Sequence, residues 1–93
     1  MSKNCVTEDR IDALLEASEI STRTEYEKVT VVNCKLPNGF VLTQASGAVD
    51  KANYSEEIGR KVCLKRIKSR LWELEGYKLA CEMAEDKEDW NED

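Results

Sequence analysis

The sequence contains no histidine and only one proline, and its four cysteines are widely separated. Without histidine, a general base would have to be a carboxylate, lysine, tyrosine or thiolate. The cysteines at positions 5, 34, 63 and 81 form no CxxC pair of the kind that marks a zinc site. The chain also lacks a P-loop, a dinucleotide-binding glycine pattern and a GxSxG motif. We therefore predict a protein that is not an enzyme and has no metal site or cofactor.

Long apolar runs are absent as well. No stretch approaches the roughly 18 consecutive apolar residues of a membrane span, and the N-terminal residues do not resemble a secretory signal. A chain of 93 residues supports one domain. We expect a soluble cytoplasmic protein without a membrane partner.

Positive charge is scarce overall but is not evenly distributed. The formal net charge of −5 disfavours a general nucleic-acid binder. Residues 55–80 nevertheless hold seven basic and four acidic side chains, whereas residues 82–93 hold seven acidic side chains and one lysine. The chain therefore has a basic segment that precedes an acidic end.

The longest periodic segment runs from residue 55 to residue 84 and predicts one long helix. One apolar stripe predicts contact with the core; it consists of Cys63, Leu64, Ile67, Leu71, Leu74 and Cys81. A second apolar group falls on the opposite side and consists of Ile58, Val62, Trp72, Leu79, Ala80 and Met83. Because so short a chain has little left to cover both sides, the second group predicts a partner.

Shorter elements precede this helix. Thr7 is a predicted N-cap before Glu8 and Asp9, and apolar spacing predicts a short amphipathic helix over residues 8–18. Residues 19–27 are polar and follow neither the helical nor the strand period, so we expect a connection there. Two β-branched segments then flank a short loop with proline and glycine, which indicates a hairpin, and Asp50 is expected to cap a short turn.

The chemistry of the loop selects the register of this hairpin. Pro37 and Asn38 suit a type I turn and Gly39 suits a left-handed residue, which gives a three-residue loop with a bulge. The predicted apolar face is then Val32, Cys34, Leu36, Phe40 and Leu42. A two-residue turn would instead place Lys35 opposite Leu42, so we prefer the first register. An isolated hairpin is marginally stable, and we expect this face to rest on the long helix.

The predicted fold is α+β, with a short N-terminal helix, a β-hairpin and a long C-terminal helix packed on the hairpin. Residues 1–84 are expected to form a single small domain. Residues 85–93 are expected to form an acidic, disordered tail.

Three segments resemble a family of small tailed-phage and prophage accessory proteins, the gene product 49 / gene 66 family. They are LPNGF at residues 36–40, AVDKANYSEEIGRK at 48–61 and LWELEGYKL at 71–79. Family members often show Ala-Cys-Val-Asp-Pro where this chain has Gly47, Ala48, Val49, Asp50 and Lys51. The resemblance implies a phage origin and a setting in the host-cell cytoplasm. It brings no established biochemical activity and no catalytic residues.

Three surfaces are candidates for binding. A basic side of the long helix, which could hold phosphates while a base stacks on the indole, consists of Lys61, Lys65, Lys68 and Trp72. A candidate oligomer or partner interface consists of Ile58, Val62, Gly76, Leu79 and Met83. A candidate acidic docking tail consists of Glu85, Asp86, Glu88, Asp89 and Trp90. The simpler interpretations are a solvated lysine face with Trp72 in a packing contact, and a solubilising tail.

Two functions follow from these surfaces. The first is a non-enzymatic phage accessory protein that binds a host protein, such as a factor of host defence or nucleic-acid processing. The second is a nucleotide or nucleic-acid binding module that uses the basic side of the helix. We also predict a homodimer or higher oligomer formed through the second apolar side. The competing account is that the first helix covers this side and that the monomer is complete.

Overall fold

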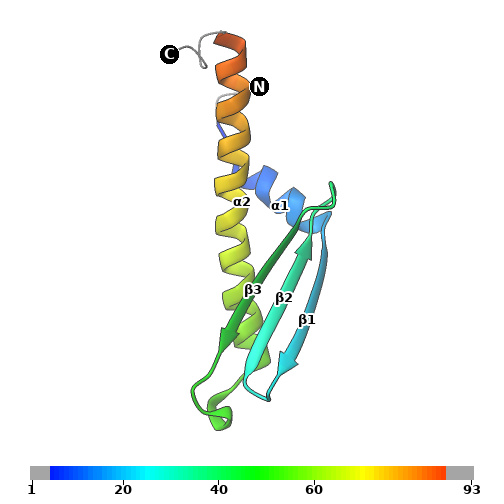
Figure 1. Ribbon diagram of the computed structural model, residues 1–93, viewed down its shortest axis with the longest axis vertical. Coiled ribbons are helices and arrows are strands. Elements are labelled where there is room, and N and C mark those ends of the chain that lie inside the picture. Colours follow the sequence, from blue (N-terminus) through cyan, green and yellow to red (C-terminus); the bar gives the residue numbers. More distant parts are fainter. Residues whose placement is uncertain (1–4, 88–93) are drawn as a thin grey trace.

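The computed structural model describes residues 5–87 and has a small sheet packed against one long helix (Figure 1). Helix α1 (Glu8–Glu16) precedes three strands, β1 (Glu19–Glu25), β2 (Val29–Lys35) and β3 (Val41–Gly47). A 3-10 turn, η1 (Lys51–Asn53), leads into helix α2 (Glu56–Lys87). The strands form an antiparallel sheet in the order β1-β2-β3, and α2 packs on β2 and β3. The predicted α+β class is confirmed.

Side-chain caps determine where these elements begin, and those at Thr7 and Asp50 were predicted. The Thr7 hydroxyl accepts a hydrogen bond from the Arg10 amide at 3.2 Å and begins α1. The Asp50 carboxylate caps η1 by accepting from the Ala52 amide at 3.0 Å. The Ser55 hydroxyl accepts from the Ile58 amide at 3.3 Å and begins α2. Helix α2 continues to Lys87, three residues past the expected end. None of the described helices is long and apolar enough to cross a membrane.

The hairpin between β2 and β3 has the predicted register, with Cys34 opposite Leu42 and Val32 opposite Gln44. Gly39 has a φ of 94°, and its amide donates to the Leu36 carbonyl at 2.8 Å, as expected for the three-residue loop. Phe40 was predicted on the same apolar face, but its side chain is 50% exposed and not buried, because it lies outside the buried cluster, next to the loop.

The expected connection at residues 19–27 was also wrong, because residues 19–25 form the edge strand β1. Its inward side chains are Ile20, Thr22 and Thr24. All three are β-branched, as is typical of strands, but only one of them is apolar. Tyr26 and Glu27 form the turn to β2 with φ values of 55° and 60°. Both central residues of such a hairpin turn need positive φ, and asparagine and glycine usually occupy these positions. Because this turn has neither residue, the sequence gives no sign of it.

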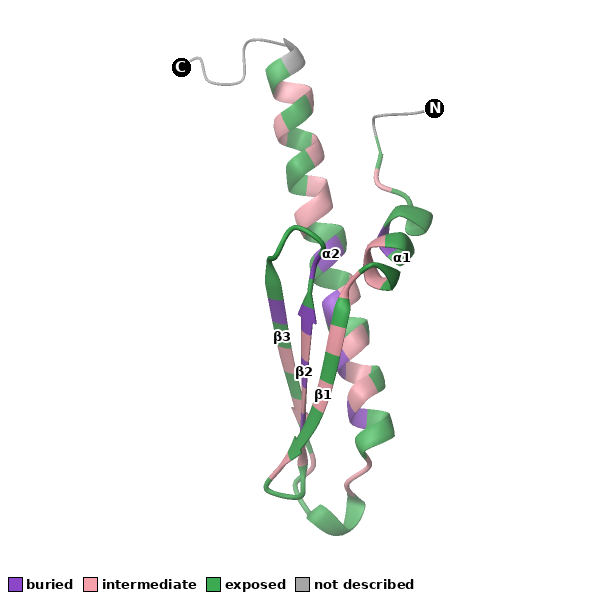
Figure 2. Cartoon of the chain, turned by 90° about the vertical axis from the view of Figure 1, so that its right-hand side faces the viewer, coloured by how far each residue is buried: buried purple, intermediate pink, exposed green. Residues whose placement is uncertain are grey.

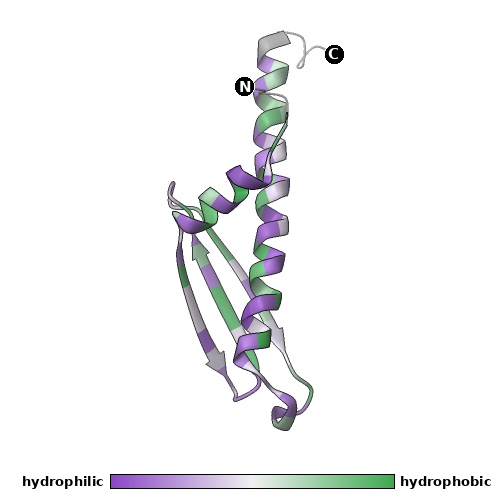
Figure 3. Ribbon diagram, turned by 180° about the vertical axis from the view of Figure 1, so that it is seen from behind, coloured by the Kyte–Doolittle hydropathy of each residue, from purple (hydrophilic) through white to green (hydrophobic). Residues whose placement is uncertain are grey.

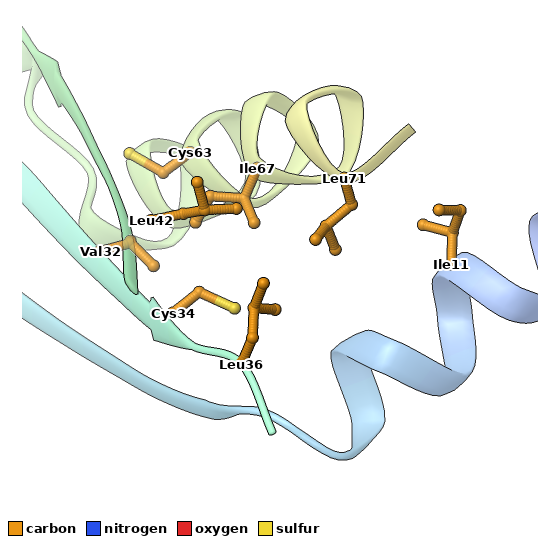
Figure 4. Packing of buried hydrophobic residues seen from close by; sticks show 8 residues of the cluster. All are labelled: Ile11, Val32, Cys34, Leu36, Leu42, Cys63, Ile67 and Leu71. Atoms are coloured by element: carbon orange, nitrogen blue, oxygen red, sulfur yellow. The ribbon is translucent and has the colours of Figure 1, made fainter. Parts of the chain in front are cut away.

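The core lies between the sheet and the first half of α2 (Figure 4). It consists of Ile11, Val32, Cys34, Leu36, Leu42, Cys63, Ile67 and Leu71. Cys34 and Cys63 are fully buried, as predicted. The expected core stripe of α2 is confirmed from Cys63 to Leu74, of which Leu64 and Leu74 are partly buried against the core. Cys81 lies farther along α2 and is outside this cluster.

Close packing of α2 on the sheet depends on Gly59, which is buried at the start of the helix. A Cβ at this position would stand 2.8 Å from Thr30 Cβ and closer still to Thr30 Oγ1. Thr30 is fully buried, and its hydroxyl lies 2.6 Å from the Tyr54 hydroxyl. The glycine therefore allows the helix to approach β2 directly.

The molecule is elongated because α2 is longer than the sheet. Its radius of gyration is 17.0 Å, compared with about 12 Å for a compact chain of this length, and its longest extent is 56 Å. Among the described residues, ion pairs join α1 to α2 at Lys68 and at Glu75. The Arg10–Glu75 pair is the one nearer the C-terminal end of α2. Beyond it, α2 projects past the sheet and past α1, and its residues up to Glu85 are exposed or half-buried (Figure 2). The projecting segment up to Lys87 is about 18 Å long.

Candidate functional site

An open groove of about 440 Å³ lies where α1, the β2–β3 loop and α2 meet. Its apolar lining comes from all three elements and consists of Leu14, Leu36, Pro37, Phe40, Leu71 and Leu74. Its polar lining consists of Arg10, Asn38, Glu75 and Lys78. The groove therefore combines an apolar surface with charged groups at a place where the core opens to solvent.

The β2–β3 loop positions one wall of the groove. The Leu36 amide donates to the Phe40 carbonyl at 2.7 Å, and the Phe40 amide donates to the Asn38 side-chain oxygen at 3.0 Å. These bonds hold the loop closed while the Phe40 ring stays half exposed. The wall is thus an ordered turn that carries an aromatic side chain.

The two helices form the opposite wall. Arg10 Nε on α1 donates to Glu75 Oε1 on α2 at 3.3 Å, which neutralises both side chains. Lys78 lies one turn beyond Glu75 and makes no ion pair within the described part of the chain. The groove therefore presents one uncompensated positive charge beside its apolar surface.

The predicted basic side of α2 is present, but its members differ in availability. Lys61 and Lys65 are exposed, and Trp72 is 38% exposed on the same side of the helix. The Lys68 ammonium contacts Glu8 at 3.0 Å and Asp12 at 3.2 Å, and these hydrogen bonds raise its pKa. Lys68 thus holds α1 against α2, and the two carboxylates place negative charge beside the proposed phosphate site.

In Figure 3, hydrophobic and hydrophilic segments alternate along α2. The second apolar side lies opposite the core-facing residues Cys63, Ile67 and Leu71, and so faces away from the sheet. Ile58 is 63% exposed, and Val62, Gly76, Leu79 and Met83 are partly exposed. Helix α1 does not cover this side, because Ile11 packs into the sheet-facing core and Lys68 receives the α1 carboxylates on the flank of α2. Among the described residues, the account of a monomer completed by α1 therefore has no support.

The acidic docking tail is only partly within the described residues. Glu85 is exposed in the last turns of α2, and Asp86 follows it in the same helix. Glu88, Asp89 and Trp90 lie outside the described residues.

The ionisable groups with displaced pKa values do not form a reactive centre. Burial raises the pKa of the Cys63 thiol, and the nearby Arg66 opposes this only in part. A raised thiol pKa disfavours the nucleophilic thiolate. A hydrogen bond with Cys81 raises the pKa of Tyr77 on the surface of α2. Within the described residues, no group of three or more potential metal ligands is present.

The groove was not predicted from the sequence, although both segments that line it carry recognisable patterns. The loop at residues 36–40 and the helix segment at 71–79 were assigned to a hairpin and to a core stripe. The available signal is Phe40 itself, a large aromatic residue beside the loop that lies on the same side as Leu36 and therefore next to the α2 stripe. Comparison with curated proteins and with solved structures found no match. A family model described as phage protein (N4 Gp49/phage Sf6 gene 66) family matches residues 6–83, and the chain belongs to this family.

Proposed function

We propose that this chain is a non-enzymatic phage accessory protein that acts in the host cytoplasm by binding a host protein. The observation that carries the proposal is the groove of about 440 Å³, which exposes apolar surface from three elements beside a charged rim. Exposed apolar patches that are rimmed by polar residues mark sites of protein–protein contact. The first partners to examine are factors of host defence and of nucleic-acid processing.

The groove also supports a statement about the partner's chemistry. A bulky apolar side chain would contact the Phe40 ring, Leu36 and Leu74, whose exposed surface it would cover. The Lys78 ammonium would meet a carboxylate next to that side chain, since Arg10 and Glu75 already compensate each other. We therefore propose a host segment that combines a large apolar residue with an acidic neighbour.

Two of the three segments that carry the family resemblance meet in this groove. Residues 36–40 form the loop wall, and residues 71–79 supply the α2 wall. The third segment, residues 48–61, contains Tyr54 and Gly59 and holds α2 against the sheet. The resemblance thus divides into one segment that serves packing and two that shape the proposed binding surface.

The test is capture from a host lysate by immobilised full-length protein at physiological salt, with groove variants beside the wild type. Phe40→Ala removes the exposed ring and Lys78→Glu reverses the free charge, whereas Lys35→Glu makes the same charge change on the outer sheet face. We expect a stoichiometric host protein with wild type and Lys35→Glu, and its loss with both groove variants. Equal capture by all four proteins, or no stoichiometric partner, would contradict the proposal.

The basic side of α2 supports an alternative function as a nucleotide or nucleic-acid binding module. Lys61, Lys65 and the exposed part of Trp72 favour it, and the bonds of Lys68 to Glu8 and Asp12 weaken it. This alternative requires quenching of indole fluorescence by nucleotide, single strand or duplex, together with affinity that falls with salt. Absent or salt-independent binding would remove it.

A further inference from the structure

We infer that the side of α2 facing away from the sheet pairs with the same side of a second copy of this chain, as an antiparallel coiled coil. The contact surface is a seam on α2, defined here as Ile58, Val62, Lys65, Ser69, Trp72, Gly76, Leu79 and Met83. Its partner would be the seam of the other copy. This surface lies apart from the groove and does not depend on the proposed function.

The spacing of the seam is that of a coiled coil. Its members alternate at intervals of four and three residues from Ile58 to Met83 without a break. They lie on the side of the helix left open by the sheet and by α1, since the core-facing residues Cys63, Ile67 and Leu71 occupy the opposite side. A helix with two such stripes can bury one in its own core and the other against a second helix.

Side-chain sizes along the seam specify one antiparallel register. When Val62 lies opposite Leu79 of the second copy, Ile58 lies opposite Met83, so two apolar pairs close each end of the contact. The same register places the large Trp72 opposite the small Ser69, and Lys65 opposite Gly76. The lysine stem can lie over a glycine while its ammonium reaches solvent. Large residues thus face small ones in the middle of the seam.

The charges that flank the seam are complementary in this same register. In antiparallel helices each flank of one helix meets the same flank of the other, so Lys61 lies opposite Glu82 of the second copy. On the other flank, Arg66 lies opposite Glu73. Each pair occurs twice by symmetry, because an isologous contact repeats every interaction. Lys61 and Glu82 make no ion pair among the described residues of one chain.

Gly76 gives an independent indication. A Cβ at this position would have nothing within 4 Å, so the single chain offers no packing reason for glycine in the middle of a helix. Glycine there costs about 1 kcal/mol relative to alanine. Close approach of a second helix, with Lys65 of the other copy across this position, supplies the reason that one chain lacks.

Helix α1 borders the seam on one flank and leaves the seam residues themselves uncovered. It holds α2 through Lys68 and Glu75, which lie on the same flank as Lys61 and Glu82, about a quarter-turn from the centre of the seam. The sheet lies on the far side of α2 (Figure 1). A second α2 could therefore lie along the whole seam, over about 38 Å of helix.

The test is the mass of the full chain in solution, measured by light scattering over a range of concentrations. We expect a dimer for the wild type and a monomer for Leu79→Asp, with circular dichroism as the check that the variant folds. Lys61→Glu and Glu82→Lys each create two repulsive contacts and should each weaken the dimer by about tenfold. The double variant Lys61→Glu/Glu82→Lys should recover wild-type affinity, and Lys35→Glu should leave it unchanged.

Three outcomes would overturn the inference. A wild type that stays monomeric at every concentration excludes the dimer. A dimer that persists in folded Leu79→Asp excludes this seam. A double variant no tighter than either single variant excludes the antiparallel register, because in a parallel pair residues 61 and 82 do not meet.

Discussion

Replacing Gly59 with alanine should destabilise the fold even though alanine is the better helix former. Alanine in a helix interior gains about 1 kcal/mol over glycine. At this position the added methyl group would stand 2.8 Å from Thr30 Cβ and closer to Thr30 Oγ1, well inside van der Waals contact. Thr30 is fully buried and its hydroxyl is bonded to Tyr54 at 2.6 Å, so the side chain cannot rotate into solvent.

The helix must therefore move away from β2 or Thr30 must lose its hydrogen bond. Overpacking of this kind costs about 1 to 3 kcal/mol or more, and the loss of a buried hydroxyl partner adds to it. We expect a net loss of about 1 to 3 kcal/mol, which lowers the urea midpoint by roughly 1 to 2 M.

The matched control is Gly76→Ala, because a Cβ there meets nothing within 4 Å. This variant should therefore show only the higher helix propensity of alanine, without a steric cost, and should be more stable by up to about 1 kcal/mol. Both substitutions are made in the Leu79→Asp background so that self-association does not enter the comparison, and unfolding in urea is followed by circular dichroism. If Gly59→Ala proves as stable as its parent, the close approach of α2 to β2 is not a constraint and the reasoning fails.

Three further predictions concern stability. Replacing Tyr26-Glu27 with Asn-Gly should stabilise the fold by about 1 to 3 kcal/mol, because both residues adopt positive φ; an unchanged urea midpoint would argue against strain in this turn. Tyr54→Phe leaves the buried Thr30 hydroxyl without its partner and should cost about 1 to 2 kcal/mol in the same assay, so a neutral result would show that the bond contributes nothing. Because burial raises the pKa of the Cys63 thiol above 9.0, the folded state favours the protonated form, and stability should fall as the pH rises above this value. The fall should be less steep in Cys63→Ala. An equal slope of stability against pH in both proteins would assign the fall to other groups.

The sequence predicts the parts of this fold in which local patterns and tertiary packing agree. Helix α2 and its core stripe follow from helical spacing over 30 residues, and the β2–β3 register follows from the turn preferences of Pro37, Asn38 and Gly39. Strand β1 is not predictable in this way because it is held by pairing with β2 and has little apolar surface of its own. Its turn uses Tyr26 and Glu27 at positive φ, where local preference points elsewhere.

The candidate site is less predictable than the fold because it is formed by segments far apart in the chain. Arg10, Phe40 and Lys78 come from three elements, and no local pattern reports that they share a groove. The availability of the Lys61 side of α2 likewise depends on α1, whose carboxylates occupy Lys68. The spare apolar side of α2 was predictable from spacing alone, since it is a property of one helix.

The groove and the seam use different parts of α2. Leu74 and Lys78 line the groove on the side nearer the sheet and α1, whereas Trp72 and Leu79 lie on the seam. A second copy on the seam would thus leave the groove open. Because equivalent flanks meet in an antiparallel pair, both copies of α1 would lie on the same side of the dimer, close to its two-fold axis. The two grooves would then face the same way, so a host partner that is itself dimeric or repetitive could occupy both at once, with an avidity greater than the affinity of either groove.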